Sequence, residues 1–198
     1  YDLPNDTNYS ETCASVGLIR FAMEMLLNEA DSSYADVIEK ALYNTVLSGL
    51  SLDGRHFFYV NPLEAVPEVC EANPERHHVK TVRQAWYACA CCPPNIARTI
   101  ADLQSLIYSV DGERFYVHQY IGSEREVTLL SGTFRLIQES ELPWKGRSVF
   151  RFESENPVSG ELALRIPQWC VRYSLTMNQH SVTDFSVERG YLVVKREW

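Results

Sequence analysis

Half of the chain's six cysteines lie in one short stretch, WYACACCPPNIAR at residues 86–98. Cys91 and Cys92 are adjacent, Cys89 precedes them by two positions, and two prolines and a helix-forming pattern follow directly. A second motif, ETC at residues 11–13, places a carboxylate and a thiol two positions apart where another helical pattern starts. Such residues bind zinc or, as thiolates, act as nucleophiles.

Three kinds of chemistry compete for these cysteines. An even number permits a disulfide framework, but a chain of 198 residues, 45% of them hydrophobic, can bury a core without such cross-links. Adjacent cysteines can hardly bridge each other without strain. A redox centre at Cys89 and Cys92 would require a parallel βαβ unit, and no such pattern surrounds it. We therefore expect a zinc site.

Spacing alone does not identify all the ligands of that site. Either Cys91 or Cys89 could join Cys92, and His77 and His78 stay candidates. The ETC motif would add a carboxylate and a thiolate from a distant part of the sequence, a closure that a metal stabilises. The first N–H groups of the helix after the cysteines favour anions, which we expect to help hold the thiols deprotonated. On the residues alone, the expected role of the zinc is structural.

The elements that must position these residues change character near residue 112. Before it, apolar residues recur at three- and four-residue spacing over residues 11–30, 34–51 and 95–107, which predicts three helices. Gly49 would end the second, and Asp-Gly at residues 111–112 the third. Asp-Gly at residues 53–54 predicts a hairpin within residues 50–64.

From residue 113 onward the pattern is that of strands, which recur at roughly ten-residue spacing with Gly, Pro or Asn between them. This rhythm predicts an antiparallel β-sandwich or barrel. We expect a helical region at residues 1–112 and an all-β region at 113–198. The predicted strands are RFYVHQYI, EVTLL, TFRLIQES, RSVFRFES, GELALRIPQW, YSLTMN and YLVVKRE.

Composition argues against two classes of partner. The formal net charge is −8, whereas nucleic-acid binding demands a basic patch. No apolar run approaches the ~20 residues that span a bilayer. We expect a small neutral or cationic substrate, no nucleic acid and no membrane; a homodimer stays open. The chain lacks an initiator Met and opens in a turn-like segment, so we expect a piece of a longer protein. Zinc thiolates favour a reducing compartment, which indicates the cytoplasm.

Five segments resemble, in order and spacing, those of glycoside hydrolase family 127: DLPNDTNYSETCASVG, SLDGRHFFYVNPLE, NPERHHV, WYACACCPPNIAR and LRIPQW. The resemblance runs over nearly all of the chain. The family comprises bacterial β-L-arabinofuranosidases with an (α/α)6-barrel catalytic domain followed by β-sandwich domains. It implies that residues 1–112 are the C-terminal part of that barrel and that residues 113–198 belong to a β-sandwich.

The resemblance also implies roles for particular residues. Zn²⁺ would be held by Glu11, Cys13, Cys91 and Cys92, and Cys91 would be the nucleophile of a retaining, exo-acting hydrolase. Glu11 would also hydrogen-bond sugar hydroxyls, and Tyr59 would line the sugar pocket. The substrate would be a β-linked L-arabinofuranoside.

The family's general acid/base is a glutamate a few residues upstream of the segment YDLPND. The resemblance therefore implies an acid/base that is not in this chain, and we expect the chain not to hydrolyse an arabinofuranosyl disaccharide by itself. A zinc-stabilised structural or carbohydrate-binding module without catalysis is the alternative.

Overall fold

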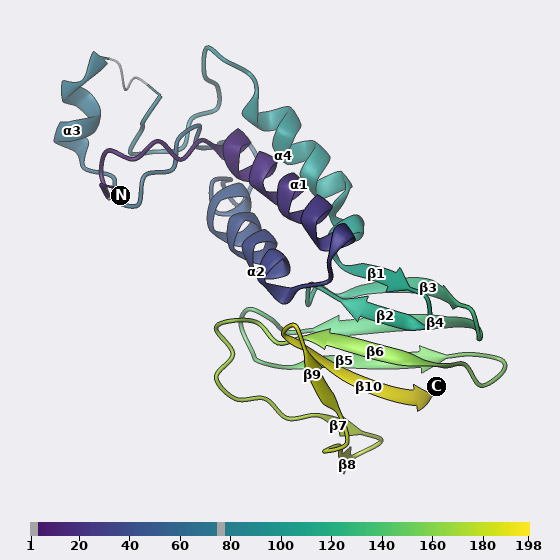
Figure 1. The fold of residues 1–198 in the computed structure, drawn as a ribbon. Coiled ribbons are helices and arrows are strands. Elements are labelled where there is room, and N and C mark those ends of the chain that lie inside the picture. Colours follow the sequence, from purple (N-terminus) through teal and green to yellow (C-terminus); the bar gives the residue numbers. More distant parts are fainter. Residues whose placement is uncertain (1–3, 75–77) are drawn as a thin grey trace. The chain divides into compact units, whose positions relative to one another are not determined.

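The structure, a computed structural model, describes residues 4–74 and 78–198. They form two compact units (Figure 1). The first comprises residues up to Glu24 and Val37–Leu103, and the second comprises Met25–Asp36 and Gln104–Trp198. Helices precede strands along the chain, as predicted, while the domain division at residue 112 stays a prediction. Among the described residues, no helix has the length and apolar character to cross a membrane.

The three predicted helices form, and one short helix was not predicted. The helical elements are α1 (Thr12–Asn28), α2 (Ser32–Ala41) continued by a π-helix (Leu42–Leu47), α3 (Pro67–Ala72), α4 (Cys92–Ala101) and a 3₁₀ turn (Leu103–Leu106). Gly49 follows the π-helix, and its backbone lies close to the carbonyl oxygen of Thr45. A Cβ at this position would lie only 2.7 Å from that oxygen, so the position favours glycine.

Buried apolar residues at helical spacing build the core of the first unit: Val16, Ile19 and Ala22 of α1, Ile38, Leu42 and Val46 of the second helical stretch, and Ile96 of α4. Arg20 of α1 forms an ion pair at 2.5 Å with Asp102, which follows α4. The apolar spacing over residues 11–30 includes Leu27, which we expected on the buried face of α1; it is 60% exposed, so that expectation was wrong.

The predicted hairpin within residues 50–64 forms only its turn. Gly54 has a φ of +69° and the Ser51 N–H donates to the carbonyl of His56 at 2.9 Å. Beyond that turn, only an isolated bridge joins Leu50 to Phe57, and Phe57 also bridges to Gln84. The predicted pair of strands was therefore wrong, because Phe57, in the expected second strand, bridges to Gln84 as well as to Leu50.

The second unit contains most of the predicted strands, in a five-stranded sheet of order β1-β2-β6-β10-β9, a three-stranded sheet β3-β4-β5 and a small pair β7-β8. Their bounds are β1 Tyr108–Asp111, β2 Arg114–Val117, β3 Ser123–Leu129, β4 Gly132–Ser140, β5 Ser148–Glu153, β6 Ser159–Arg165, β7 Thr176–Met177, β8 His180–Ser181, β9 Ser186–Glu188 and β10 Tyr191–Glu197. The third predicted helix was too long, because β1 occupies its expected end.

The two larger sheets share one hydrophobic core, which confirms the sandwich. The core combines Phe115, Val117, Leu162, Leu164, Leu192 and Val194 of the five-stranded sheet with Val127, Leu129, Phe134 and Leu136 of the three-stranded sheet. The expectation of a purely antiparallel sandwich was wrong, since β2 and β6 pair in parallel. Between them the chain forms the whole three-stranded sheet, the long crossover that a parallel pair requires.

A buried arginine ties residues 25–36 to the strands within the second unit. Arg165 is 1% exposed, forms an ion pair with Asp36, and donates to the carbonyl of His118. The Gln119 side chain donates to the carbonyl of Ala35 at 2.8 Å. A buried charge is tolerated when it is paired and hydrogen-bonded, as here.

His118 belongs to the same network and is fully buried. Its Nε2 lies 2.7 Å from Ser109 Oγ and its Nδ1 2.7 Å from the Tyr191 hydroxyl. Burial, together with the charge of Arg165, lowers the pKa of His118 to about 3. The imidazole is therefore neutral in the folded protein across the physiological pH range.

Candidate metal centre and active site

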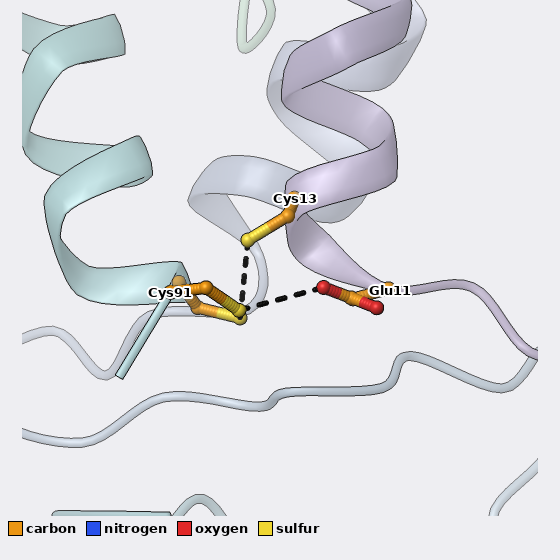
Figure 2. Close-up of side chains that lie close together, drawn as sticks. Glu11, Cys13 and Cys91 are labelled. Carbon is orange, nitrogen blue, oxygen red and sulfur yellow. Dashed lines mark hydrogen bonds between the residues drawn. The ribbon is translucent and has the colours of Figure 1, made fainter. Parts of the chain in front are cut away.

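Four ligand-type side chains converge in the first unit. One carboxylate oxygen of Glu11 and the sulfurs of Cys13, Cys91 and Cys92 all lie within 4.8 Å of one another. Cys91 Sγ is 3.5 Å from Glu11 Oε1, and Cys92 Sγ is 3.7 Å from Cys13 Sγ and 3.8 Å from Cys91 Sγ. Figure 2 shows Glu11 and Cys13 projecting toward the sulfur of Cys91 from the beginning of α1.

An extended segment fixes the ETC motif beside α4. The Thr12 N–H donates to the carbonyl of Tyr59 at 3.0 Å, and the Thr12 hydroxyl donates to the carbonyl of Phe58 at 2.9 Å. Glu11 forms an antiparallel bridge with Val60. These contacts hold Glu11 and Tyr59 on neighbouring segments, and both side chains contact Cys91 Sγ.

The adjacent cysteines occupy the beginning of α4, where Cys91 is the N-cap and Cys92 the first helical residue. Pro93 and Pro94 follow, and proline has no N–H. The helix end therefore offers fewer donors than we expected, and burial raises the pKa of the Cys91 thiol to about 11 and that of Cys92 as well. The expectation that the helix N-terminus helps to hold these thiols deprotonated stays a prediction.

Tyr59 lies against the donor cluster. Its hydroxyl is 3.4 Å from Cys91 Sγ, and its ring packs beside His78 and Tyr87, with centroids 4.8 Å and 5.6 Å away. The hydrogen bond with Cys91 and burial raise the pKa of Tyr59, so the phenol keeps its proton. Its role in lining a sugar pocket stays a prediction.

The remaining candidate ligands lie outside the four-donor group. Cys89 is exposed, and a hydrogen bond with Tyr59 lowers its pKa. All six cysteines are free, including Cys70 and Cys170. His78 packs against Tyr59, whereas His77 lies outside the described residues.

Two residues that lie beside the four donors were not identified from the sequence. The Asn95 side chain donates to Cys13 Sγ at 3.1 Å and to the carbonyl of Cys91 at 3.0 Å. The Tyr87 hydroxyl is buried without a hydrogen-bond partner among the described residues. Asn95 comes one helical turn after Cys91, and this spacing is the only sequence signal that pointed to it.

The donor set fits a tetrahedral metal ion. Sulfurs bonded at ~2.3 Å to a tetrahedral centre lie about 3.8 Å apart, and a sulfur and an oxygen lie about 3.5 Å apart. Three of the six separations, at 3.7, 3.8 and 3.5 Å, match these values, and all four donor atoms lie within 4.8 Å of one another. Thiolates select soft or borderline cations rather than Ca²⁺ or Mg²⁺. Glu11, Cys13, Cys91 and Cys92 could therefore hold one such ion.

Comparison with known proteins gives the family. Residues 1–105 match the catalytic domain and residues 114–198 the middle domain of the GH127 β-L-arabinofuranosidases. The chain is 43% identical to a non-reducing end β-L-arabinofuranosidase of Bifidobacterium longum subsp. longum, over 98% of this chain and 30% of that protein.

Solved structures agree with this relationship. The chain is 44% identical, with a TM-score of 0.92, to a GH127 β-L-arabinofuranosidase from Geobacillus stearothermophilus T6, over 100% of this chain and 31% of that chain. A second match, a GH127 β-arabinofuranosidase, is 32% identical with a TM-score of 0.86, over 100% of this chain and 32% of that chain. The chain thus spans about a third of the length of these relatives. It belongs to glycoside hydrolase family 127.

Proposed function

We propose that the protein to which this chain belongs is a retaining, exo-acting β-L-arabinofuranosidase that uses Cys91 as its nucleophile. Zn²⁺ is held by Glu11, Cys13, Cys91 and Cys92. The observation that carries this proposal is the convergence of three sulfurs and one carboxylate oxygen, drawn from two distant segments, within 4.8 Å of one another. Family membership supplies the substrate class, and the names of the relatives agree with it.

The two adjacent cysteines have different roles in this proposal. Cys92 is 0% exposed, so its sulfur is suited to holding the metal and not to reaching a sugar. Cys91 is only partly buried and contacts both Glu11 and Tyr59. When bound, Zn²⁺ would displace the thiol protons and so supply the thiolate that a pKa of about 11 withholds at neutral pH.

The reaction consists of two displacements. The Cys91 sulfur attacks the anomeric carbon, the glycosidic C–O bond breaks, and the leaving oxygen takes a proton from a general acid. Water then attacks the same carbon and gives a proton to the conjugate base, while the C–S bond breaks and its electron pair returns to sulfur. Following the family resemblance, we assign the acid/base to a glutamate preceding Tyr1, not to a residue of this chain.

Glu11 and Tyr59 would orient the sugar at the attacking sulfur. The Glu11 Oε1 atom and the Tyr59 hydroxyl lie 3.5 and 3.4 Å from Cys91 Sγ, so both groups stand at the place where the sugar must bind. The second oxygen of Glu11 is available for a sugar hydroxyl. Because the phenol of Tyr59 keeps its proton, it can donate a hydrogen bond.

We also propose that the helices belong to an (α/α)6 barrel. Leu18 and Phe21 of α1 are 46% and 64% exposed, which is the kind of apolar surface that a neighbouring barrel helix would cover. Six free thiols suit the reducing cytoplasm, which we propose as the compartment. For the whole protein, the proposal includes a possible homodimer.

Elemental analysis and two serine variants test the proposal. The 198-residue chain, prepared without chelator, should hold about one Zn²⁺, and Cys92→Ser should lose it. In a protein of the relatives' full length, Cys91→Ser should lose turnover by several orders of magnitude, since serine lacks a comparably accessible anion. Cys170→Ser, a free cysteine outside the cluster, is the matched control and should keep both metal and turnover.

A sugar-mimicking electrophile separates catalysis from a purely structural metal site. Selective labelling of Cys91 would support the nucleophile, because only a reactive thiolate is alkylated readily. Four unreactive cluster residues in a zinc-loaded protein would instead favour the structural alternative. Near-normal turnover of Cys91→Ser would refute the proposed nucleophile outright.

A further inference from the structure

The beginning of α4 is poor in backbone donors at the place where sulfur charge gathers. Among its first residues, Pro93 and Pro94 have no N–H, and the Asn95 N–H is directed at the carbonyl of Cys91, 3.4 Å away. Thiolates are ordinarily stabilised by such N–H groups at helix ends. A donor from a side chain is therefore needed if the sulfurs are to be supported from this helix.

Asn95 supplies that donor. Its Nδ2 lies 3.1 Å from Cys13 Sγ, within the range of a hydrogen bond to sulfur, and 3.0 Å from the carbonyl oxygen of Cys91. One amide group thus connects a sulfur on α1 to the backbone of the residue that caps α4. The Thr99 hydroxyl donates to the carbonyl of Asn95 at 2.8 Å, which adds a further contact to this helical turn.

We infer that Asn95 is a positioning residue of the metal centre, which holds the Cys13 sulfur toward Cys92 and withdraws negative charge from it by an N–H···S hydrogen bond. The inference rests on the proposed metal site and extends it to a residue outside the donor set. Three thiolates and a carboxylate around a dication leave two excess negative charges, which a donor to one sulfur partly offsets. Residues that hydrogen-bond metal ligands orient them and tune their donor strength.

The chain contains a matched asparagine with the same backbone contact and no sulfur. Asn44 donates from Nδ2 to the carbonyl of Lys40 at 3.0 Å, four residues earlier, as Asn95 does to Cys91. Removing either side chain costs one such hydrogen bond. Only the change at Asn95 removes a contact to Cys13, so the pair separates a general effect on a helix from an effect on the metal.

The experiment measures metal affinity and the spectrum of the Co²⁺-loaded 198-residue chain for the unmodified protein, Asn95→Leu, Asn95→Asp and Asn44→Leu. Chelator competition should show Zn²⁺ bound about 10- to 100-fold more weakly by Asn95→Leu, and more weakly still by Asn95→Asp, whose carboxylate would face a thiolate. The sulfur-to-Co²⁺ charge-transfer band of Asn95→Leu should move to longer wavelength, because sulfur without the donor gives up an electron more easily. Asn44→Leu should change neither quantity.

The outcomes are distinguishable. An unchanged affinity and an unchanged band in Asn95→Leu would overturn the inference and leave the metal site intact. If Asn95→Leu does not fold by circular dichroism, the same two measurements on Asn95→Asp, which has nearly the same size, decide in the same way. Failure of the unmodified chain to bind either Zn²⁺ or Co²⁺ would overturn the proposed metal site and this inference with it.

Discussion

Mild acidification should destabilise the second unit through His118. This imidazole is fully buried between Ser109 and Tyr191, and burial together with Arg165 lowers its pKa to about 3. In the unfolded chain the same group takes up a proton near its ordinary pKa of about 6.5. Between these two values only the unfolded state binds the proton, so the stabilisation present above pH 6.5 is lost progressively as the pH falls toward 3.

The size of the effect follows from the two pKa values of His118. One pKa unit corresponds to about 1.4 kcal/mol, so the full difference is about 5 kcal/mol and is reached only near pH 3. At pH 5, where the unfolded imidazole is almost fully protonated and the folded one is neutral, the loss is about 2 kcal/mol. This is a large share of the roughly 5–15 kcal/mol that typically stabilises a domain.

Urea denaturation at pH 7.5 and pH 5.0 measures this loss. We expect His118→Gln to lose about 2 kcal/mol less than the unmodified chain between the two pH values, because glutamine does not titrate. His180 lies exposed in β8 of the same unit, so His180→Gln is the matched control and should keep the pH dependence of the unmodified chain.

An NMR titration of the imidazole signals gives an independent reading. The signal of His118 should stay constant between pH 7.5 and pH 5. Equal losses of stability in His118→Gln and in the unmodified chain, or a His118 signal that titrates near pH 6.5, would refute this reasoning.

Three further expectations concern packing, charge and metal. Gly190→Ala should cost about 1–3 kcal/mol in thermal unfolding, because φ is +77° and the new Cβ would lie 1.9 Å from the Ser32 hydroxyl oxygen; Gly112→Ala, with φ of +59° and open space, should cost less. Asp36→Asn should cost about 3–5 kcal/mol in urea denaturation by removing the negative charge that faces the buried Arg165 guanidinium. A strong chelator should increase proteolysis at the cysteine-rich segment, and added Zn²⁺ should reverse the increase.

Two Asp-Gly pairs show how far local patterns predict this fold. Asp-Gly at residues 111–112 was interpreted as the end of a helix, yet Asp111 pairs with Arg114 across a tight turn, and Gly112 has a φ of +59°. Asp-Gly at residues 53–54 was interpreted as a hairpin, yet only its turn and one bridge form. The dipeptide predicts the turn in both places, but whether the flanking residues pair depends on distant partners, such as Gln84 beside Phe57.

The donor cluster was more predictable than the network around it. The cysteine and glutamate motifs predicted a zinc site because few other residues bind a soft cation, and the family resemblance implied the four donors before their geometry was known. Spacing could not choose between Cys89 and Cys91. The structure distinguishes them, because Cys91 caps α4 among the donors while Cys89 stays exposed outside the group. For Asn95 the only signal was its spacing of one helical turn from Cys91, which is too common in helices to single it out.

The ion pair of Arg165 with Asp36 bears on how this protein can evolve. Arg165 lies in a strand of the middle domain, which the family comparison begins at residue 114, and its partner carboxylate lies in residues 25–36, far earlier in the chain. A gene rearrangement that copied residues 114–198 into another protein would transfer the guanidinium without the aspartate. The recipient would lose the Asp36 carboxylate that faces Arg165 here, a loss of stability that selection would disfavour. The two domains are therefore expected to be inherited together, rather than exchanged as independent modules.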